Sequence, residues 1–577
     1  MLQQLFYMIV ISAICMLWGL PATLIIYKKN DSRDFWMRNS LGFYCFLFSA
    51  GLIVLSFISS IICLFFPLTF NLLLILTCLL IIVIFSRRHN IYQLIKHYPF
   101  RFSFTLEAFF TVLCIFMFIV LGTGKHANND THIYHVQLVK WINEYGTVPG
   151  LANLFPRYGT GSNWFNLISF FYMPFTGNEN YSWLNTTAVT WFFLWLLNNW
   201  KFHSIAGSIA SSIMSHFYFL LLLFGLFEWE MFRDAASSTN YDFIVTTLTL
   251  ITISYLLESV LFNYPKKVSF IFCAICLSIT PFKFSGIFSL LLIVFHLALN
   301  GKLKDWFWVS CMGVLIIIPF IIKNYINTGY PFFPVSYSFA SPDWQMPKEM
   351  ADYFRKYLYL TNRFYNSITL DFSRLPEVMQ EPWMSAWVNG LRLQQKILIF
   401  GSLSSLPLFF VKSKLRIDHR KLRLLFVFLI LMAAAWFFTS PSPRFAYAVL
   451  VTLAFFPWCF LLGSRITLQI HKPMLILTGF ILSYYLYRKS AALLKDPARF
   501  ISTMQMERPP LQKINIDGIN FNLPEYFNNG WMRDCYDTEL PCIYKENKYL
   551  HPRGMTLKDG FRITPKPDSI FIRQYVY

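Results

Sequence analysis

The chain has 577 residues, of which 56% are hydrophobic and 14% are charged, with a formal net charge of +20. In soluble domains about a quarter of the residues are charged. Charge-free runs such as 72–85 and 314–322 belong to longer apolar stretches, close to the roughly twenty residues that a helix needs to cross the hydrocarbon core of a membrane. This composition excludes a soluble globular domain and predicts an integral membrane protein.

The apolar stretches, taken in chain order, predict an all-α polytopic protein with about fourteen transmembrane helices. Residues 1–27 lack the basic stretch and the cleavage site of a signal peptide, so we expect a retained first helix there. The predicted helices lie at 3–27, 41–65, 68–86, 102–123, 181–199, 205–226, 242–262, 268–282, 285–299, 305–323, 393–411, 423–438, 445–463 and 473–487.

Lysine and arginine concentrate in the short connections that follow each odd-numbered helix, so all these connections lie on one side of the membrane. By the positive-inside rule that side is the cytoplasm. The same rule accounts for the positive charge, which in a soluble protein would suggest nucleic acid as a partner. The basic connections are 28–38, 87–101, 201, 266–267, 302–304, 412–423 and 465–472.

The long polar segments then lie on the extracytoplasmic face, as loops 124–163, 227–241 and 324–391 and a C-terminal region. We divide the chain into N-terminal transmembrane helices, a transmembrane core with these loops, and an extracytoplasmic region too short for a large independent domain. That region is expected to be a small cap over the outer face or a docking surface. The three parts are residues 1–101, 102–487 and 488–577.

Most of the eleven cysteines lie in apolar stretches, where cysteine behaves as a small buried hydrophobic residue. Cys535 and Cys542 differ because they stand in a polar segment on the outer side. An oxidising compartment favours a disulfide between them, whereas a zinc site would need two further ligands and only His551 is near.

The first outer loop contains the densest group of ionisable residues. Asp130 comes shortly after an apolar helix, and His132 and His135 are three residues apart, so a helix starting here would place both histidines on one face. Asp130 could cap that helix or act as a catalytic carboxylate. Arg157, in the following segment rich in glycine, proline and asparagine, could contact a phosphate or a lipid head group.

Further ionisable residues stand at the outer ends of other helices. Asp242 begins a helix, so capping again competes with catalysis, and Lys283, Lys323 and Arg444 each end or link apolar segments. A cation near hydrocarbon needs a partner or the interface, and snorkelling would explain one of them. Carboxylates and cations together on one face favour a site for an anionic, phosphate-bearing substrate. The second loop adds Glu228, Glu230, Arg233 and Asp234.

The sequence has no Walker A motif, no G-x-G-x-x-G after a strand and no H-E-x-x-H, so ATP-driven transport and zinc proteolysis lose support. Residues 102–450 resemble the GT-C superfamily of membrane glycosyltransferases, which includes protein mannosyltransferases and aminoarabinose transferases. The resemblance depends on Asp130, on Asp242 and on Lys323-Asn324 leading to 329–334. Segments 134–150, 440–445, 535–542 and 553–562 are similar to a group of uncharacterised bacterial membrane proteins.

The resemblance implies inverting transfer of a sugar from a polyprenyl-phosphate carrier on the periplasmic face of a bacterial inner membrane. Asp130 would be the general base, Asp242 would position the acceptor or a metal, and Lys283 and Arg444 would neutralise the departing phosphate. Lys323 stands where many members have arginine, and Asn129 replaces one member of the usual acidic pair. Involvement of Mg or Mn therefore stays open, and no metal ligands are assigned.

The predicted partners are a lipid-linked sugar donor, a glycan, lipid or protein acceptor, and membrane lipids, with no nucleic acid. The predicted substrate-binding residues are His132, His135, Arg157, Lys283, Lys323 and Arg444. A flippase of a lipid-linked saccharide is one alternative, although it should carry ionisable residues along a mid-membrane path, where Glu107 and Glu258 are the main exceptions. A non-enzymatic polysaccharide-assembly protein is the other.

Overall fold

The computed structural model describes residues 1–577 except 30–32, 100–104, 177–180, 265–266, 365–381, 407–417, 464–465, 467, 507, 526–532 and 576–577. Parts of the predicted outer loop 324–391 and of the basic connections 28–38, 87–101, 266–267, 412–423 and 465–472 therefore lie outside the described residues.

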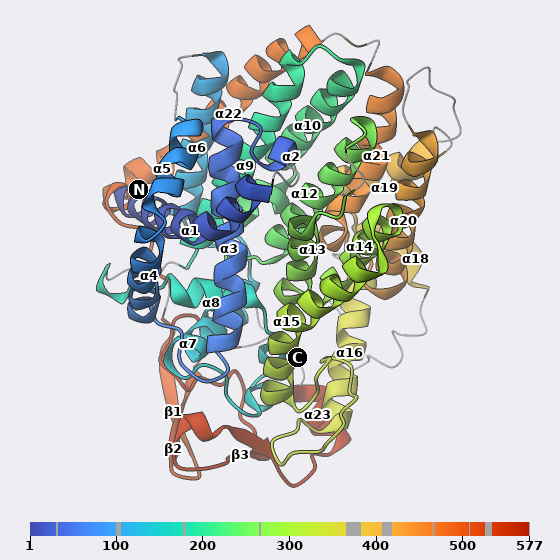
Figure 1. Cartoon of the computed structure of the whole chain (residues 1–577). Coiled ribbons are helices and arrows are strands. Elements are labelled where there is room, and N and C mark those ends of the chain that lie inside the picture. The colour runs from blue at the N-terminus through green and yellow to red at the C-terminus, as the bar shows by residue number, and fades with distance from the viewer. Residues whose placement is uncertain are drawn as a thin grey trace.

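Every one of the fourteen predicted ranges contains a helix. These helices are α1 (Leu2–Lys29), α3 (Ser40–Ile62), α4 (Phe70–Phe85), α6 (Leu106–Gly122), α9 (Trp183–Ile205), α10 (Ile209–Phe227), α12 (Asp242–Leu261), α13 (Phe270–Phe282), α14 (Leu290–Asn300), α15 (Leu303–Thr328), α19 (Leu393–Ser405), α20 (His419–Thr439), α21 (Tyr447–Leu462) and α22 (His471–Lys495). They form the large bundle of Figure 1.

Length and composition qualify six of the described helices to cross a membrane: α1, α3, α10, α12, α15 and α20. A seventh span results if α4 and α5 (Arg88–His97), which meet at 90°, count as one. Several others are apolar but shorter, among them α6, α13 and α21. The helical membrane-protein prediction is therefore confirmed in this coarse form.

Several helices begin at a side chain that accepts a hydrogen bond from the first turn. Asn39 accepts from the N–H of Gly42 at the start of α3, and Thr69, Thr105, Ser208, Ser269 and Asp418 do the same for α4, α6, α10, α13 and α20. Such caps satisfy backbone donors that have no partner within the helix. They explain why short polar residues mark the points where the apolar stretches begin.

Helix α12 is the central helix, and 94% of its apolar 18-residue stretch is buried inside the protein. Asp242 begins it, and Glu258 lies near its other end. Glu258 is fully buried and pairs with Arg38 at 2.9 Å and with His203 at 3.0 Å, so its charge is compensated. The other predicted mid-membrane exception, Glu107, lies in the first turn of α6. Both carboxylates therefore stand near helix ends.

The C-terminal region departs from the all-α prediction because it contains strands. β1 (Leu511–Ile516) and β2 (Ile519–Pro524) form an antiparallel hairpin in which Leu511 faces Pro524. Its turn, Asp517-Gly518, has positive φ at both residues, the geometry that tight hairpins prefer. β3 (Leu550–Pro552) pairs with β4 (Phe561–Ile563), and α23 (Ser569–Tyr575) follows.

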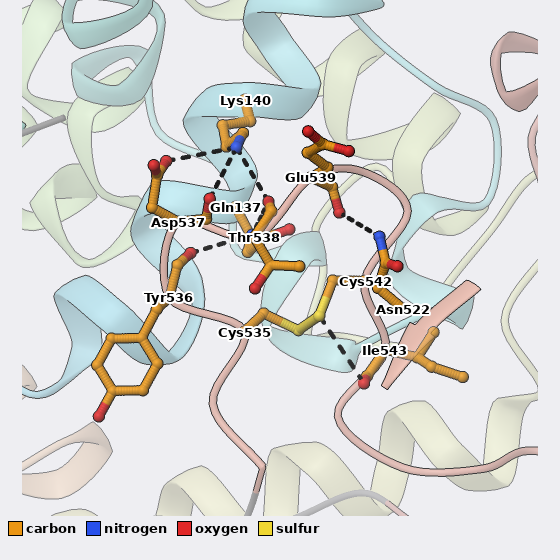
Figure 2. Close-up of a disulfide and its surroundings, with 10 residues drawn as sticks. All are labelled: Gln137, Lys140, Asn522, Cys535, Tyr536, Asp537, Thr538, Glu539, Cys542 and Ile543. Carbon is orange, nitrogen blue, oxygen red and sulfur yellow. Dashed lines mark hydrogen bonds and ion pairs between the residues drawn. A yellow bond between two sulfur atoms is a disulfide. The ribbon is translucent and has the colours of Figure 1, made fainter. Parts of the chain in front are cut away.

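The strands lie at one end of the bundle, next to α7 (Val136–Glu144) and α16 (Lys348–Arg363) (Figure 1). Cys535 and Cys542 form a disulfide. Gln137 donates to the carbonyl of Tyr536 at 3.0 Å, and Lys140 donates to that of Asp537 at 3.1 Å, so α7 holds the disulfide loop (Figure 2).

The C-terminal residues are also hydrogen-bonded to the loop 124–163. The N–H of Phe561 donates to the carbonyl of Pro149 at 3.0 Å, and the hydroxyl of Tyr575 donates to that of Leu154 at 2.8 Å. The C-terminal region therefore packs on the loop 124–163.

Candidate functional site

Asp130 stands at the end of the loop that follows α6, directly before the π-helical turn η1 (Thr131–His135). Its carboxylate makes no capping hydrogen bond, so the capping interpretation is wrong for this residue. Instead Oδ1 accepts a hydrogen bond from Nη1 of Arg157 at 2.9 Å, and 26% of the side chain is exposed. Oδ2 makes no hydrogen bond to another described residue.

Arg157 is fixed on several sides. It belongs to the short turn η3 (Pro156–Gly159), and its Nη2 donates to the hydroxyl of Tyr357 in α16 at 2.7 Å. Its guanidinium lies 5.5 Å from the ring centre of Tyr134 and 5.7 Å from that of Tyr357, within range of cation–π attraction. The arginine predicted to contact a phosphate or head group is thus engaged with Asp130.

The surroundings decide the protonation state of Asp130. Burial raises its pKa, but the cations Arg157 first, and then Arg444 and Lys283, lower the pKa below its ordinary value. Opposite charges nearby stabilise the ionised form. Asp130 is therefore an ionised carboxylate at neutral pH.

A second carboxylate, Asp242, is shared by two cations from different parts of the chain. Lys283, at the end of α13, pairs with its Oδ1, and Nε of Arg444, in the turn η9 (Pro443–Phe445), lies 3.3 Å from its Oδ2. The Lys283 ammonium also lies 3.5 Å from the ring centre of Phe445. Burial lowers the pKa of Lys283 to about 8, although Asp242 opposes this shift.

His135 lies within electrostatic range of both carboxylates. It is 1% exposed, its Nδ1 shares a hydrogen bond of 2.7 Å with Oγ1 of Thr239, and its Nε2 is buried without a hydrogen-bond partner among the described residues. Burial lowers its pKa to about 3, while Asp130 and Asp242 both act to raise it. A neutral histidine thus lies within electrostatic range of both carboxylates, and these residues form one site.

His132 does not share a face with His135, contrary to the sequence prediction. Its Nε2 lies 3.5 Å from Oδ2 of Asp534, and its ring stacks on Tyr536 with 4.8 Å between ring centres. A π-helical turn has more residues per turn than an α-helix, so residues three apart diverge around the axis. His132 contacts the C-terminal region and His135 contacts the loop 227–241.

Lys323 is also placed differently from the other predicted cations. It is 1% exposed, and its Nζ donates to Oδ1 of Asn166, in α8 (Asn163–Phe170), at 2.5 Å. Among the described residues it makes no ion pair with a carboxylate. The structure therefore does not join Lys323 directly to Asp130 or Asp242.

The sequence analysis identified only part of a further charged group. Arg392, at the start of α19, lies 2.5 Å from Oε1 of Glu230 and 3.4 Å from Oε1 of Glu228. The hydroxyl of Tyr447 lies 2.9 Å from a carboxylate oxygen of each glutamate. The glutamates were recognisable as loop carboxylates. Arg392 and Tyr447 were missed, and their only signal was their place at the ends of apolar helices.

The described residues contain no group of three or more metal-ligating side chains. Asp130 is paired with Arg157, and Asp242 with Lys283 and Arg444. A divalent cation prefers several oxygen ligands and would have to displace these cations. The residues as arranged do not fit Mg or Mn.

Residues 1–451 match a family described as "Domain of unknown function (DUF8201)". The chain belongs to this family. The DUF8201 match contains Asp130, Asp242, Lys283 and Arg444 and ends before the disulfide and the strands of the C-terminal region. No curated protein and no solved structure matches the chain.

Proposed function

We propose that this protein is a membrane glycosyltransferase that moves a sugar from a polyprenyl-phosphate carrier to a cell-envelope acceptor. In this proposal the chain crosses a bacterial inner membrane about fourteen times, with the site on the periplasmic face. One observation carries the proposal: an ionised, partly exposed Asp130 lies within electrostatic range of two half-buried cations, Lys283 and Arg444, that both pair with Asp242.

The reaction needs a base for the acceptor and positive charge for the leaving group. As the acceptor oxygen bonds to the anomeric carbon, Oδ2 of Asp130 takes the hydroxyl proton, because Oδ1 is occupied by Arg157. The bond from the anomeric carbon to the phosphate oxygen breaks, and its electron pair stays on the phosphate. A single displacement of this kind inverts the anomeric centre.

A departing phosphate requires cations and no acid. Lys283 and Arg444 together exceed the charge of Asp242 by one, and both are held in place by it. Fixed charges aimed at a developing anion are a strong source of rate enhancement. Asp242 thus orients the two cations, which extends the role that the resemblance gives it.

A small cavity lies beside these cations. A cavity of about 40 Å³ lies between α12, α20 and α21, next to the ring of Phe445 that contacts Lys283. It is lined by small hydroxyl and apolar side chains, including Thr246, Thr249, Ser289 and Trp436. No comparable observation favours a flippase or an assembly protein, because Glu258 is paired and buried and offers no open path.

The test is the profile of surface glycans and glycolipids in the bacterium that encodes the protein, in wild type, a deletion strain and strains expressing Asp130→Asn or Asp343→Asn at equal level. Asp343 is the matched control, an outer aspartate paired with Arg553 at 2.8 Å outside the site.

We expect the deletion to lose one sugar-containing product, Asp130→Asn to lose the same product, and Asp343→Asn to keep it. Full restoration by Asp130→Asn would refute the role of Asp130 as base.

A further inference from the structure

Asp234 is a buried carboxylate that the site described above does not use. It begins the single turn α11 (Asp234–Ala236) in the second outer loop and is 4% exposed. Among the described residues it makes no ion pair. Its Oδ2 instead accepts hydrogen bonds from two asparagine amides, Asn240 at 2.8 Å and Asn128 at 3.5 Å.

The same two asparagines also hold the backbone of the two site aspartates. Oδ1 of Asn128 accepts the backbone N–H of Asp130 at 2.9 Å, and Oδ1 of Asn240 accepts the backbone N–H of Asp242 at 2.9 Å. Each is an Asx turn, in which an asparagine side chain fixes the backbone two residues later. One buried carboxylate therefore holds the amide groups of both turns.

Other bonds tie the loops together around this point. Oγ1 of Thr239 lies 3.1 Å from Oγ1 of Thr131, and the Thr239 N–H donates to the same oxygen at 3.3 Å. Within the second loop, Oγ of Ser238 donates to the carbonyl of Asp234 at 2.7 Å and accepts the N–H of Asn240 at 3.2 Å. The two loops are thus held together close to both Asx turns.

We propose that Asp234 is the positioning residue of this site, acting through Asn128 and Asn240 to fix the backbone of Asp130 and of Asp242 in one mutual arrangement. The consequence for transfer depends on the proposed function, because it concerns the alignment of the base with the phosphate-binding cations. The bridge itself is a property of the fold. An unpaired buried carboxylate is costly, and this cost is explained if the residue serves both turns at once.

The test measures hydrogen–deuterium exchange of the full-length protein in lipid nanodiscs, in peptides that contain Asp130 and in peptides that contain Asp242. In Asp234→Ala both asparagine amides lose their acceptor. We expect faster exchange at both sites, by about tenfold, the loss of one ordinary hydrogen bond. In Asp234→Asn the amide oxygen still accepts, and we expect exchange at both sites to stay within about twofold of wild type.

A change at Asp242 alone would overturn the proposal, since Asp234 would then brace only its own loop. If Asp234→Ala does not fold, Asn240→Asp decides the question. Its carboxylate can still accept the Asp242 N–H but repels Asp234, so the bridge predicts faster exchange at Asp130 as well as at Asp242. Unchanged exchange at Asp130 in that variant would overturn the bridge.

The functional consequence is read separately from the surface product. We expect Asp234→Ala to reduce the product about tenfold at equal protein level and Asp234→Asn to restore at least half of it. If exchange behaves as expected but Asp130→Asn leaves the product intact, the bridge stands and the proposed transferase fails. If Asp130→Asn abolishes the product but exchange at Asp130 is unchanged in the Asp234 variants, the bridge is refuted and the proposed transferase stands.

Discussion

The ionisation of Asp234 has a calculable effect on stability. Burial raises its pKa from 3.8 to about 6, opposed by the amides of Asn240 and Asn128 and assisted by Glu230. Arg444 lowers the pKa slightly from another element, and His126 of the first loop, whose pKa burial lowers to about 4, bonds to the carbonyl of Ser237 nearby.

The sign follows from linkage between protonation and folding. The folded protein binds this proton more tightly than the unfolded chain, so the stability that Asp234 contributes is present below pH 3.8 and is lost as pH rises through about 6. The full shift corresponds to about 3 kcal/mol, of which roughly half is lost between pH 5 and pH 7.5.

Asp234→Asn keeps the acceptor oxygen and removes the ionisation. We therefore expect the wild type to lose about 1 kcal/mol of stability relative to Asp234→Asn between pH 5 and pH 7.5. Thermal unfolding of both proteins in nanodiscs across this range measures the difference. Infrared titration of the carboxyl band, taken as wild type minus variant, measures the pKa directly. A constant stability difference across the range, together with a carboxyl that titrates near pH 4, would refute the reasoning.

Three other perturbations test neighbouring features. Arg157→Gln removes the main cation beside Asp130, so burial then raises the pKa of Asp130. We expect the acidic limb of the pH–activity profile to move to higher pH. A limb at the same pH would count against the ion pair of Asp130 and Arg157. Lys283→Ala should lower product formation by about 100-fold, with Lys283→Arg retaining more, as measured by initial rates; equal activity in all three proteins would exclude a phosphate contact. Replacing Cys535 and Cys542 by serine opens a loop with a sequence separation of 7, and we expect a loss of about 2–3 kcal/mol in the unfolding of the C-terminal region, monitored by exchange in its strands. Identical exchange in the oxidised and variant proteins would contradict this expectation.

Local sequence determined where the helices lie. Apolar runs and the short polar residues that cap them are properties of neighbouring positions, so each of the fourteen predicted ranges contains a helix. Whether all fourteen cross the membrane stays a prediction. Spacing in a polar outer segment also singled out Cys535 and Cys542, which the structure joins.

Only the tertiary structure decided which charges meet. Arg157 pairs with Asp130 because the turn η3 and the helix α16 pack beside η1, and Asp242 is shared by Lys283 and Arg444 because three separate helix ends converge. The π-helical turn separated the two histidines, which α-helical spacing had placed together. Such pairings depend on how the helices pack, and the hydropathy along the chain does not determine which charged residues pair.

The bridge at Asp234 shows the same division. The pattern Asn-x-Asp is present three times in the sequence, at Asn128, Asn240 and Asn515, and the first two copies predict the local turns that lead to Asp130 and Asp242. That both turns share one carboxylate follows only when the two outer loops are brought together. Hydrogen bonds within a few residues can be read from the chain, whereas a buried acceptor common to two distant segments exists only in the folded protein.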